Sequence, residues 1–311
     1  MSKTRYKVRN WPEYNLALKN RFRLTVLMSE EVFSGWYASP SGRRGAPRRY
    51  SDLAIRFALT LRVLFNLPLR GCEGFVGDVL RLLGMVLGCP DYTTLCRRGK
   101  MLNIALPRLR DGERIYMVVD SSGLKIYGEG EWKVRVHGKS KRRTWRKLHI
   151  GVDADTGVIV AGALTTAEVH DSEMLPGLLS GMKGVLEAVG GDGAYDTRED
   201  HDAISEVGAK ALIPPRKGAK IWRHGNRKDR PHVRDEILRY LRKHGRKKWK
   251  EESGYHKRSL AETAFFRIKT IFGDRLRSRD FHNQATEAFL RLSVLNRMTA
   301  LGMPESYPVT N

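Results

Sequence analysis

The stretch of the sequence best suited to chemistry is residues 255–272, which read YHKRSLAETAFFRIKTIF. Wound as an α-helix, this stretch places four polar residues on one stripe about 60° wide: Tyr255, Arg258, Glu262 and Lys269. Apolar side chains gather on the other side of the cylinder, and Gly273 follows where a helix C-terminus commonly has a residue of positive φ. A carboxylate flanked by two cations and a tyrosine is either a surface ion-pair ladder or a reactive face. The helix alone leaves both interpretations open.

Two aspartates farther up the chain favour the reactive face. Asp120 ends the apolar run IYMVV, which is typical of a central strand buried on both faces. Asp192 lies between Gly191 and Gly193 at the tip of a later strand, and small neighbours there let a metal and a phosphate approach the backbone. Asp196 comes four residues later and is interpreted as a cap of the following helix.

Three carboxylates from these elements can meet at one edge of a mixed sheet. Clustered anions repel one another by roughly 4 kcal/mol per pair at ~4 Å and an effective dielectric constant near 20. They stay ionised only when a cation lies between them, and oxygen-only ligands select hard ions such as Mg²⁺ or Mn²⁺. Such ions in pairs activate an attacking oxygen and stabilise a leaving one. The pattern therefore indicates metal-dependent phosphodiester chemistry.

Strands and helices alternate around these carboxylates. We predict strands near residues 115–120, 144–152, 158–164, 189–191 and 210–213, with helices after Asp171 and through Val207. Setting aside a small hairpin predicted from residues 124–127 and 133–136, the order is three strands, helix, strand, helix, strand and then the 255–272 helix. This order predicts an α/β fold with a mixed sheet flanked by helices.

The region before the first strand is predicted to be helical. Ser51 is a suitable N-cap for a first helix that ends at Pro68, and a second helix follows. Asp91 or Thr93 caps a third helix running to about residue 106, and this helix displays two arginines, Arg97 and Arg98. Three short helices of which the last is basic indicate a helix-turn-helix unit that reads the DNA major groove. Any small helical bundle with one charged helix would give a similar pattern.

The charge balance points to a polyanionic partner. The 311 residues include 57 Lys and Arg against 34 Asp and Glu, a formal net charge of +23. Nucleic acid is the expected partner and an anionic membrane surface is the alternative. Residues 214–258 alone hold 17 Lys and Arg against five Asp and Glu. No run of 18 apolar residues and no apolar signal-peptide core is present, so we expect a soluble chain that stays inside the cell.

Several other site classes have no support in the sequence. The three cysteines are odd in number, contain no CxxC pair and have no histidines at zinc spacing, so we expect reduced thiols. No phosphate-binding G-x-x-x-x-G-K-[ST] or G-x-G-x-x-G loop occurs, which removes local support for nucleotide hydrolysis. Trp222 and Trp249 lie in the basic segment, where base stacking and ordinary packing are both open.

With these residues in place, the sequence resembles the DDE transposases of bacterial insertion sequences. The spacing Tyr255-x2-Arg258-x3-Glu262-x6-Lys269 reproduces the Y-R-E-K signature of one branch of that family. Asp120 in VVDSSGLKIYG is similar to the first acidic residue of the family, and Asp192 in GDGAYD is similar to the second. The resemblance covers roughly residues 50–301 and implies a ribonuclease-H-like fold.

The resemblance also implies roles for the residues that carry it. Asp120, Asp192 and Glu262 would be the catalytic residues and would hold two Mg²⁺ ions, with Mn²⁺ as a substitute. Arg258 and Lys269 would bind DNA phosphates, with Tyr255 also contacting DNA at the end being cut. The implied partners are double-stranded DNA, as terminal inverted repeats and as target, and a homodimer or larger assembly on DNA. The implied location is the bacterial cytoplasm, associated with the nucleoid, with no membrane partner.

The expected domains are a basic flexible arm and linker at residues 1–49, a helical DNA-binding domain at 50–110 and a catalytic domain at 111–311. The catalytic domain includes the basic segment at 214–254. The expected function is binding and hydrolysis of transposon ends, followed by transfer of the freed 3′-hydroxyl to target DNA. The alternatives are a metal-dependent DNA endonuclease without strand transfer and a catalytically silent DNA-binding protein on the same scaffold.

Overall fold

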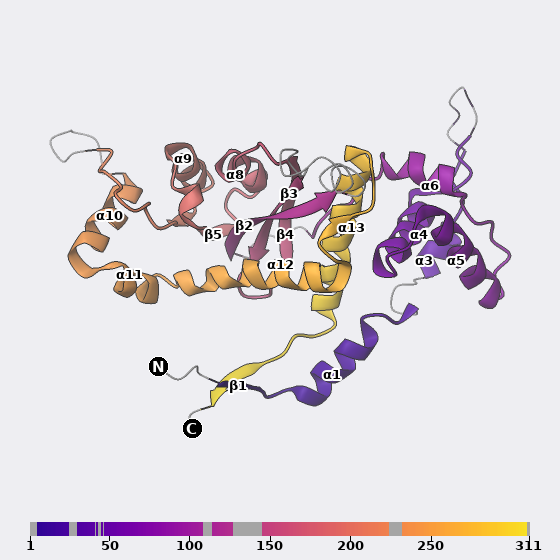
Figure 1. Ribbon diagram of the computed structural model, residues 1–311, viewed down its shortest axis with the longest axis horizontal. Helices are drawn as coiled ribbons and strands as arrows, with labels where there is room; N and C mark the ends of the chain where they lie inside the picture. Colours follow the sequence, from indigo (N-terminus) through magenta and orange to yellow (C-terminus); the bar gives the residue numbers. More distant parts are fainter. Residues whose placement is uncertain are drawn as a thin grey trace, which may run out of the picture. The chain divides into compact units, whose positions relative to one another are not determined.

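The computed structural model describes residues 5–24, 30–40, 42, 45, 47–107, 114–126, 145–223 and 232–309. The chain forms two compact units (Figure 1), one of residues 1–105 with 280–311 and one of residues 106–279. Within the described parts of the chain, no helix is long and apolar enough to cross a membrane.

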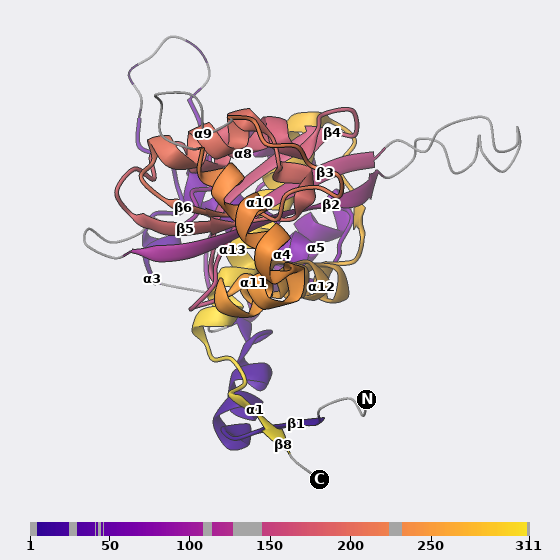
Figure 2. The ribbon, with the colours of Figure 1, turned by 90° about the vertical axis from the view of Figure 1, so that its left-hand side faces the viewer.

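The second unit is built on a mixed sheet in the order β4-β3-β2-β5-β6 (Figure 2). The long strand β2 (Ile115–Ile126) pairs antiparallel with β3 (Trp145–Asp153), which pairs antiparallel with β4 (Ile159–Thr166). On the other side of β2, β5 (Leu186–Gly190) and β6 (Lys210–Leu212) run parallel, and β7 (Arg275–Leu276) pairs with the end of β2. This is the predicted ribonuclease-H-like arrangement, with three antiparallel strands followed by two parallel ones.

Helices cover both faces of this sheet (Figure 1). On one face, α8 (Asp171–Leu179) and α9 (Arg198–Glu206) bury Leu175 and Ile204 against Met117 and Val119 of β2. On the other face lies α12 (Ser259–Phe272), which buries its apolar side, including Phe265 and Ile268. Side chains alternate along a strand. Val118, Asp120 and Ser122 of β2 therefore point away from Met117 and Val119, toward the face that α12 covers.

The basic segment between β6 and α12 contains two helices, α10 (Val233–His244) and α11 (Arg246–Glu252). The predicted helix over residues 255–272 starts as a 3₁₀ turn, η2 (Tyr255–Arg258), before α12 begins. Gly273 ends α12 with φ 78°, as expected of a residue after a helix C-terminus. The prediction of one continuous α-helix was therefore wrong for its first turn, residues 255–258.

The first strand is longer than predicted, because β2 continues through Leu124 to Ile126 alongside β3. Residues 124–126, predicted to open a hairpin, are thus part of the central strand. The other half of that hairpin, with its turn around Gly128, lies outside the described residues.

The first unit contains the predicted helices α4 (Asp52–Leu64), α5 (Leu69–Leu82) and α6 (Tyr92–Gly99). The Ser51 cap is confirmed, since its side chain accepts a hydrogen bond from Ala54 N. Of the two candidates for the third helix, Asp91 is the N-cap and accepts from Thr93 N, whereas Thr93 is not the cap. The third helix ends at Gly99, about seven residues earlier than predicted.

The C-terminal helix α13 (Phe281–Ala300) explains this early end. Thr286 Oγ1 donates to Gly99 O at 2.7 Å, and a Cβ at Gly99 would lie 2.6 Å from Asn283 Oδ1. The end of α6 therefore packs directly against α13, and a larger residue at position 99 would have to displace the Asn283 side chain. Residues 280–311 belong to the first unit, whereas the expected catalytic domain continued to residue 311.

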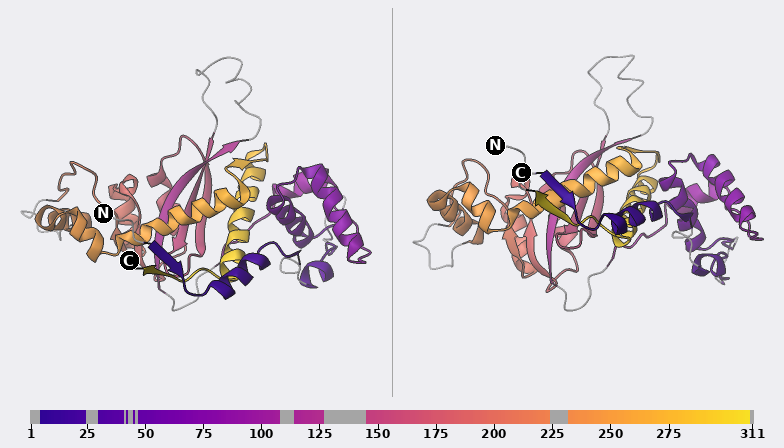
Figure 3. Two further views of the ribbon diagram at one scale, coloured as in Figure 1. Left: turned by 60° about the horizontal axis from the view of Figure 1, so that its bottom comes forward. Right: turned by 90° about the horizontal axis from the view of Figure 1, so that it is seen from below.

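Residues 1–49 contain regular structure where a flexible arm was expected, and that expectation was wrong for the described residues. They form β1 (Arg5–Val8), α1 (Trp11–Asn20) and α3 (Glu30–Ser34). β1 pairs antiparallel with β8 (Ser306–Val309) at the other end of the chain (Figure 3). Trp36 is fully buried and donates its indole N–H to Gly88 O at 2.8 Å. The ordering thus comes from partners distant in sequence.

Candidate active site at the edge of the mixed sheet

Asp120 on β2 and Asp192 just after β5 lie at the same level of two neighbouring parallel strands. Val118 of β2 is in register with Gly190 of β5, and each aspartate comes two residues after one member of that pair. β5 ends at Gly190 while β2 continues, so Asp120 lies beside the turn that carries Asp192. The sheet therefore brings together the first two predicted carboxylates.

The third carboxylate comes from α12, on the face of the sheet to which the even residues of β2 point. The Arg258 guanidinium contacts the Glu262 carboxylate, and its Nη1 lies 4.0 Å from Asp120 Oδ2. Farther along α12, Lys269 Nζ donates to Ser122 Oγ at 2.6 Å. All of the predicted residues of the stripe except Tyr255 are thus tied to one another or to the same strand.

The charges at this edge are incompletely compensated. Burial raises the pKa of Asp120, and the nearby charges of Asp192 and Glu262 raise it further, against the Ser121 N–H and Arg258, which lower it. The Ser121 N–H donates to Asp120 Oδ1 at 2.9 Å. Arg258 is the cation between Asp120 and Glu262. The local electrostatics favour the arrival of a further cation.

The donor set suits a hard divalent ion, because it consists of carboxylate oxygens that destabilise one another as anions. In the arrangement described, the Glu262 carboxylate is engaged by Arg258. Across the described ranges, no group of three or more His, Cys, Asp and Glu residues is arranged to hold a metal ion. The three carboxylates thus have the chemistry of a metal site without a closed set of ligands.

Asp192 caps the short 3₁₀ turn η1 (Gly193–Tyr195), with Ala194 N donating to Asp192 Oδ1 at 2.8 Å. Packing requires a glycine at position 191, which the sequence did not reveal. A Cβ there would lie 2.9 Å from the ring of Tyr195, which is 1% exposed. At Gly193, by contrast, a Cβ would make only ordinary contacts. The glycine before Asp192 therefore makes room for a buried tyrosine.

Tyr255 lies at the start of the stripe and packs against Trp249, with ring centroids 5.5 Å apart. Burial raises the pKa of Tyr255, with Asp192 and Glu262 raising it further and Arg258 and Arg246 lowering it. The charges of two of the three predicted carboxylates, Asp192 and Glu262, therefore act on Tyr255. Trp249 is buried. Of the two interpretations open for it, base stacking and packing, the structure supports packing.

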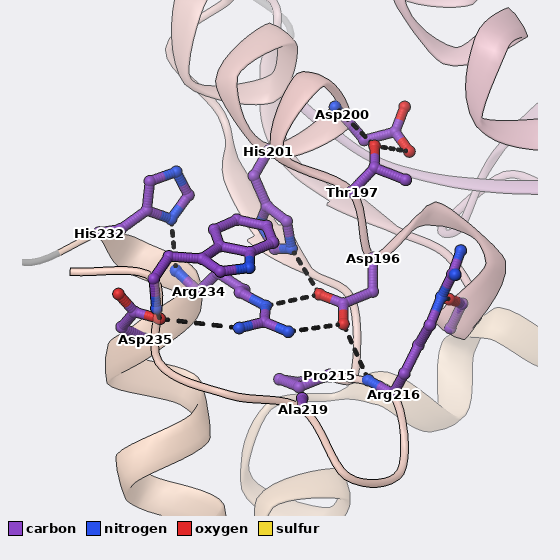
Figure 4. A network of polar contacts seen from close by, with 12 residues as sticks. Asp196, Thr197, Asp200, His201, Pro215, Arg216, Ala219, His232, Arg234 and Asp235 are labelled. Atoms are coloured by element: carbon purple, nitrogen blue, oxygen red, sulfur yellow. Dashed lines mark hydrogen bonds and ion pairs between the residues drawn. The ribbon is translucent and has the colours of Figure 1, made fainter.

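Asp196 was interpreted as a helix cap, and the structure corrects this. Thr197 is the N-cap of α9, its side chain accepting from Asp200 N. Asp196 is buried and accepts two hydrogen bonds from Arg234 of α10, at 2.8 and 3.0 Å (Figure 4). The two residues are 38 positions apart, and Arg234 is one of 17 cations in its segment. Sequence spacing gave no signal for this pair.

Further groups complete this buried network (Figure 4). His201 Nε2 lies 3.3 Å from Asp196 Oδ1, and Arg216 N donates to Asp196 Oδ2 at 2.8 Å. Burial alone would raise the pKa of Asp196, but the hydrogen bonds from His201, Arg234 and the Arg216 backbone outweigh it, and the pKa is lowered. The Arg234 guanidinium lies 4.0 Å from the ring centroid of Trp222, so this tryptophan also has a packing role.

The two arginines predicted to read DNA differ in their surroundings within the first unit. Arg97 is exposed on α6 and donates a long hydrogen bond, 3.5 Å, to Thr94 Oγ1. Arg98 donates to Tyr50 O at 2.7 Å and pairs with Asp52, and its side chain is 11% exposed. Arg98 therefore ties α6 to the start of α4.

Two models of the transposase DDE domain match this chain, one over residues 19–129 and the other over residues 111–297. An uncharacterized protein of Aquifex aeolicus (strain VF5) is 28% identical over 157 residues. That alignment spans 45% of this chain and 45% of the relative, so this chain matches less than half of the relative's length.

Among solved structures, the cryo-EM structure of the piggyBac transposase synaptic complex with hairpin DNA is similar at a TM-score of 0.41 and 11% identity. The match covers 95% of this chain and 76% of that one. The fold of the second unit is defined by the strand order and directions of its own sheet, and not by this similarity.

Proposed function

The chain belongs to the transposase DDE domain family, and from this premise we propose that it is the transposase of a bacterial insertion sequence, of the branch with the Y-R-E-K signature. It binds transposon ends, hydrolyses phosphodiester bonds there and joins the freed 3′-hydroxyl to target DNA. The observation that supports this most directly is the convergence of Asp120, Asp192 and Glu262 at one sheet edge, where their charges act on one another.

In this proposal Asp120, Asp192 and Glu262 hold divalent metal, expected as two Mg²⁺ ions with Mn²⁺ as a substitute. Bound there, such ions activate the attacking oxygen and stabilise the leaving one. The pKa of Asp120, raised by burial and by its anionic neighbours, fits this role because a bound cation would relieve the repulsion. Glu262 joins the set by exchanging its contact with Arg258.

The other residues of the stripe position DNA in this proposal. Arg258, once free of Glu262, and Lys269 at Ser122 present cations beside the carboxylates, where they bind phosphates. Tyr255, half-buried against Trp249, contacts the DNA end being cut. Fixed cations next to the reacting phosphate stabilise the charge that develops in the transition state.

The helices of the first unit provide end recognition in this proposal. α4, α5 and α6 form a helix-turn-helix-type unit, in which Arg97 is the exposed candidate for a base or phosphate contact. The partners are double-stranded DNA, both as terminal inverted repeats and as target. Cleavage and joining of two ends imply a homodimer or larger assembly on DNA, in the bacterial cytoplasm and associated with the nucleoid.

The test is a cleavage and joining assay on DNA that carries the sequences flanking the gene. Wild type with Mg²⁺ should cut at the ends and yield joined products, whereas Ca²⁺ should support binding alone. Glu262→Gln should abolish cleavage while end binding stays nearly intact. The control is Glu251→Gln, which removes an exposed carboxylate of α11 and should cut normally.

Each of the other functions gives a different result in this assay. Nicked DNA without joined products would identify an endonuclease. Binding without cutting, in either Mg²⁺ or Mn²⁺, would identify a silent DNA-binding protein.

A further inference from the structure

The orientation of Asp192 depends on the path of a five-residue loop. Asp192 caps η1 through its hydrogen bond from Ala194 N, so its carboxylate follows the backbone of Gly193 and Ala194. Tyr195, buried beneath, and Gly191, which admits the tyrosine ring, fix one side of this loop. The other side faces the basic segment that follows β6.

Arg216, at the start of the basic segment, binds the loop directly. Its Nε donates to Gly193 O at 2.7 Å and its Nη2 donates to Ala194 O at 2.9 Å. These are the carbonyls of the two residues after Asp192. A planar guanidinium that binds two successive carbonyls fixes the orientation of both peptide groups. The side chain of Arg216 thus restrains the turn that orients Asp192.

Asp196, at the end of the same loop, holds Arg216 in place (Figure 4). One oxygen of its carboxylate accepts from Arg216 N, and the pair of oxygens accepts the bidentate contact of Arg234. Arg234 in turn donates to Lys220 O at 2.6 Å through Nη1. Both ion-pair partners are buried, with side chains 1% and 4% exposed. The contact is therefore rigid and shielded from salt.

These contacts join two parts of the molecule with different roles. One is the loop that carries Asp192. The other is residues 214–258, whose excess of 12 cations (17 Lys and Arg against five Asp and Glu) suits it to phosphates. The structure ties the first to the second through Arg216 and Asp196, so a displacement of the segment is transmitted to the loop.

We propose that Arg216 and Asp196 are positioning residues for Asp192, holding its carboxylate in register with the basic segment. This inference rests on the proposed function, in which Asp192 is a catalytic carboxylate. Neither residue touches the reacting atoms. Residues that orient a ligand-bearing group typically change metal affinity or activity by about 10–100-fold when removed.

Arg216→Ala is the informative variant, because it leaves the buried pair of Asp196 and Arg234 intact. The matched control is Arg242→Ala, which removes the same charge from the same segment. Arg242 also donates to a backbone carbonyl, Ala219 O at 3.3 Å, which lies outside the loop. Both variants lose one cation near DNA, and only one of them loses the restraint on Asp192.

The measurements are single-turnover cleavage at saturating DNA across a Mg²⁺ titration, and amide hydrogen exchange of the full-length protein. Arg216→Ala should cut about 10–100-fold more slowly than Arg242→Ala and need more Mg²⁺. It should also speed exchange of the Ala194 amide, because that N–H is held by Asp192. Arg216→Lys, which keeps the charge but has one donor nitrogen in place of the two that bind the loop, should recover part of both effects.

Equal cleavage rates and equal exchange in Arg216→Ala and Arg242→Ala would overturn the proposal, and Arg216 would then be a phosphate contact alone. Failure of the proposed function gives a different result, because wild type itself would not cut. The Ala194 exchange still decides the positioning role in that case. Faster exchange in Arg216→Ala alone would support it, and unchanged exchange would overturn it.

Discussion

Asp192 and Asp196 begin and end one loop, yet their surroundings are opposite. Asp196 is buried and fully compensated by Arg234, His201 and the Arg216 backbone. Asp192 is half-buried, accepts one backbone hydrogen bond, and has no ion-pair partner within the described part of the chain. The sheet edge around Asp192 gathers three carboxylates against Arg258. In this loop, the carboxylate whose charge is compensated stabilises the fold, and the carboxylate without an ion-pair partner among the described residues is available to bind a ligand.

The largest effect is expected where the compensation is complete. Asp196→Ala removes the bidentate partner of the buried Arg234 guanidinium and leaves it beside Asp235 at 3.7 Å, and removing one member of a buried pair costs about 3–5 kcal/mol. Asp196→Asn should also destabilise, because an amide replaces one of the two acceptor oxygens that bind the guanidinium with a donor group and removes the negative charge. Urea unfolding measures both. The control is Asp155→Asn, which breaks the exposed pair with Lys257 and should cost under about 1 kcal/mol. Equal losses at the two sites would contradict the comparison.

A pH-dependent effect is expected at Asp200, which is buried on α9 near the same network. Burial raises the pKa of Asp200 to about 7, with Glu199 and Asp196 raising it and the Thr197 hydrogen bond and Arg216 lowering it. The folded state therefore holds the neutral form, and its stabilisation declines as pH rises from about 4 toward 7.

Asp200→Asn cannot ionise, so it tests this shift directly. Its melting temperature should exceed that of wild type by a margin that grows between about pH 4 and 7 and then levels off. Thermal melting at several pH values measures the margin. A margin that does not change with pH would show that Asp200 is ionised at its ordinary pKa.

A smaller loss of stability is expected on substituting Arg98, whose charge is compensated, than on substituting Asp196, and no loss is expected on substituting the exposed Arg97. Arg98→Ala removes a charge-assisted hydrogen bond to Tyr50 O and the pair with Asp52, and should cost about 1–3 kcal/mol of stability. Arg97→Ala should leave stability unchanged and weaken binding to DNA, with a shallower dependence on salt. Melting and filter binding at two salt concentrations distinguish them. If Arg98→Ala weakens DNA binding without losing stability, the roles are reversed.

The smallest effect on stability is expected at the uncompensated edge. Asp120→Asn removes one of three mutually repelling carboxylates and should raise the melting temperature slightly in the absence of metal. Mg²⁺ should then stabilise wild type more than the variant, because binding to the folded state adds to its stability. Melting with and without Mg²⁺ tests this. A lower melting temperature for Asp120→Asn in metal-free buffer would instead assign Asp120 a structural role.

The sequence alone determined the features that depend on local pattern. The apolar run before Asp120, the glycines around Asp192 and the spacing of Arg258, Glu262 and Lys269 predicted the order of strands and helices and the residues of the sheet edge. The caps at Ser51 and Asp91 were also predictable, because a cap binds N–H groups two or three residues away. Such features are encoded within a few positions of one another.

Only the tertiary structure decided the contacts between distant segments. Arg234 is one cation among many in its segment, and burial against Asp196 alone distinguishes it. The end of α6 at Gly99 is set by α13, and β1 is ordered by β8 some 300 residues away. The physical reason is the same in each case. A side chain's role depends on its burial and on the charge of its neighbours, and these are fixed by packing between elements that no sequence interval records.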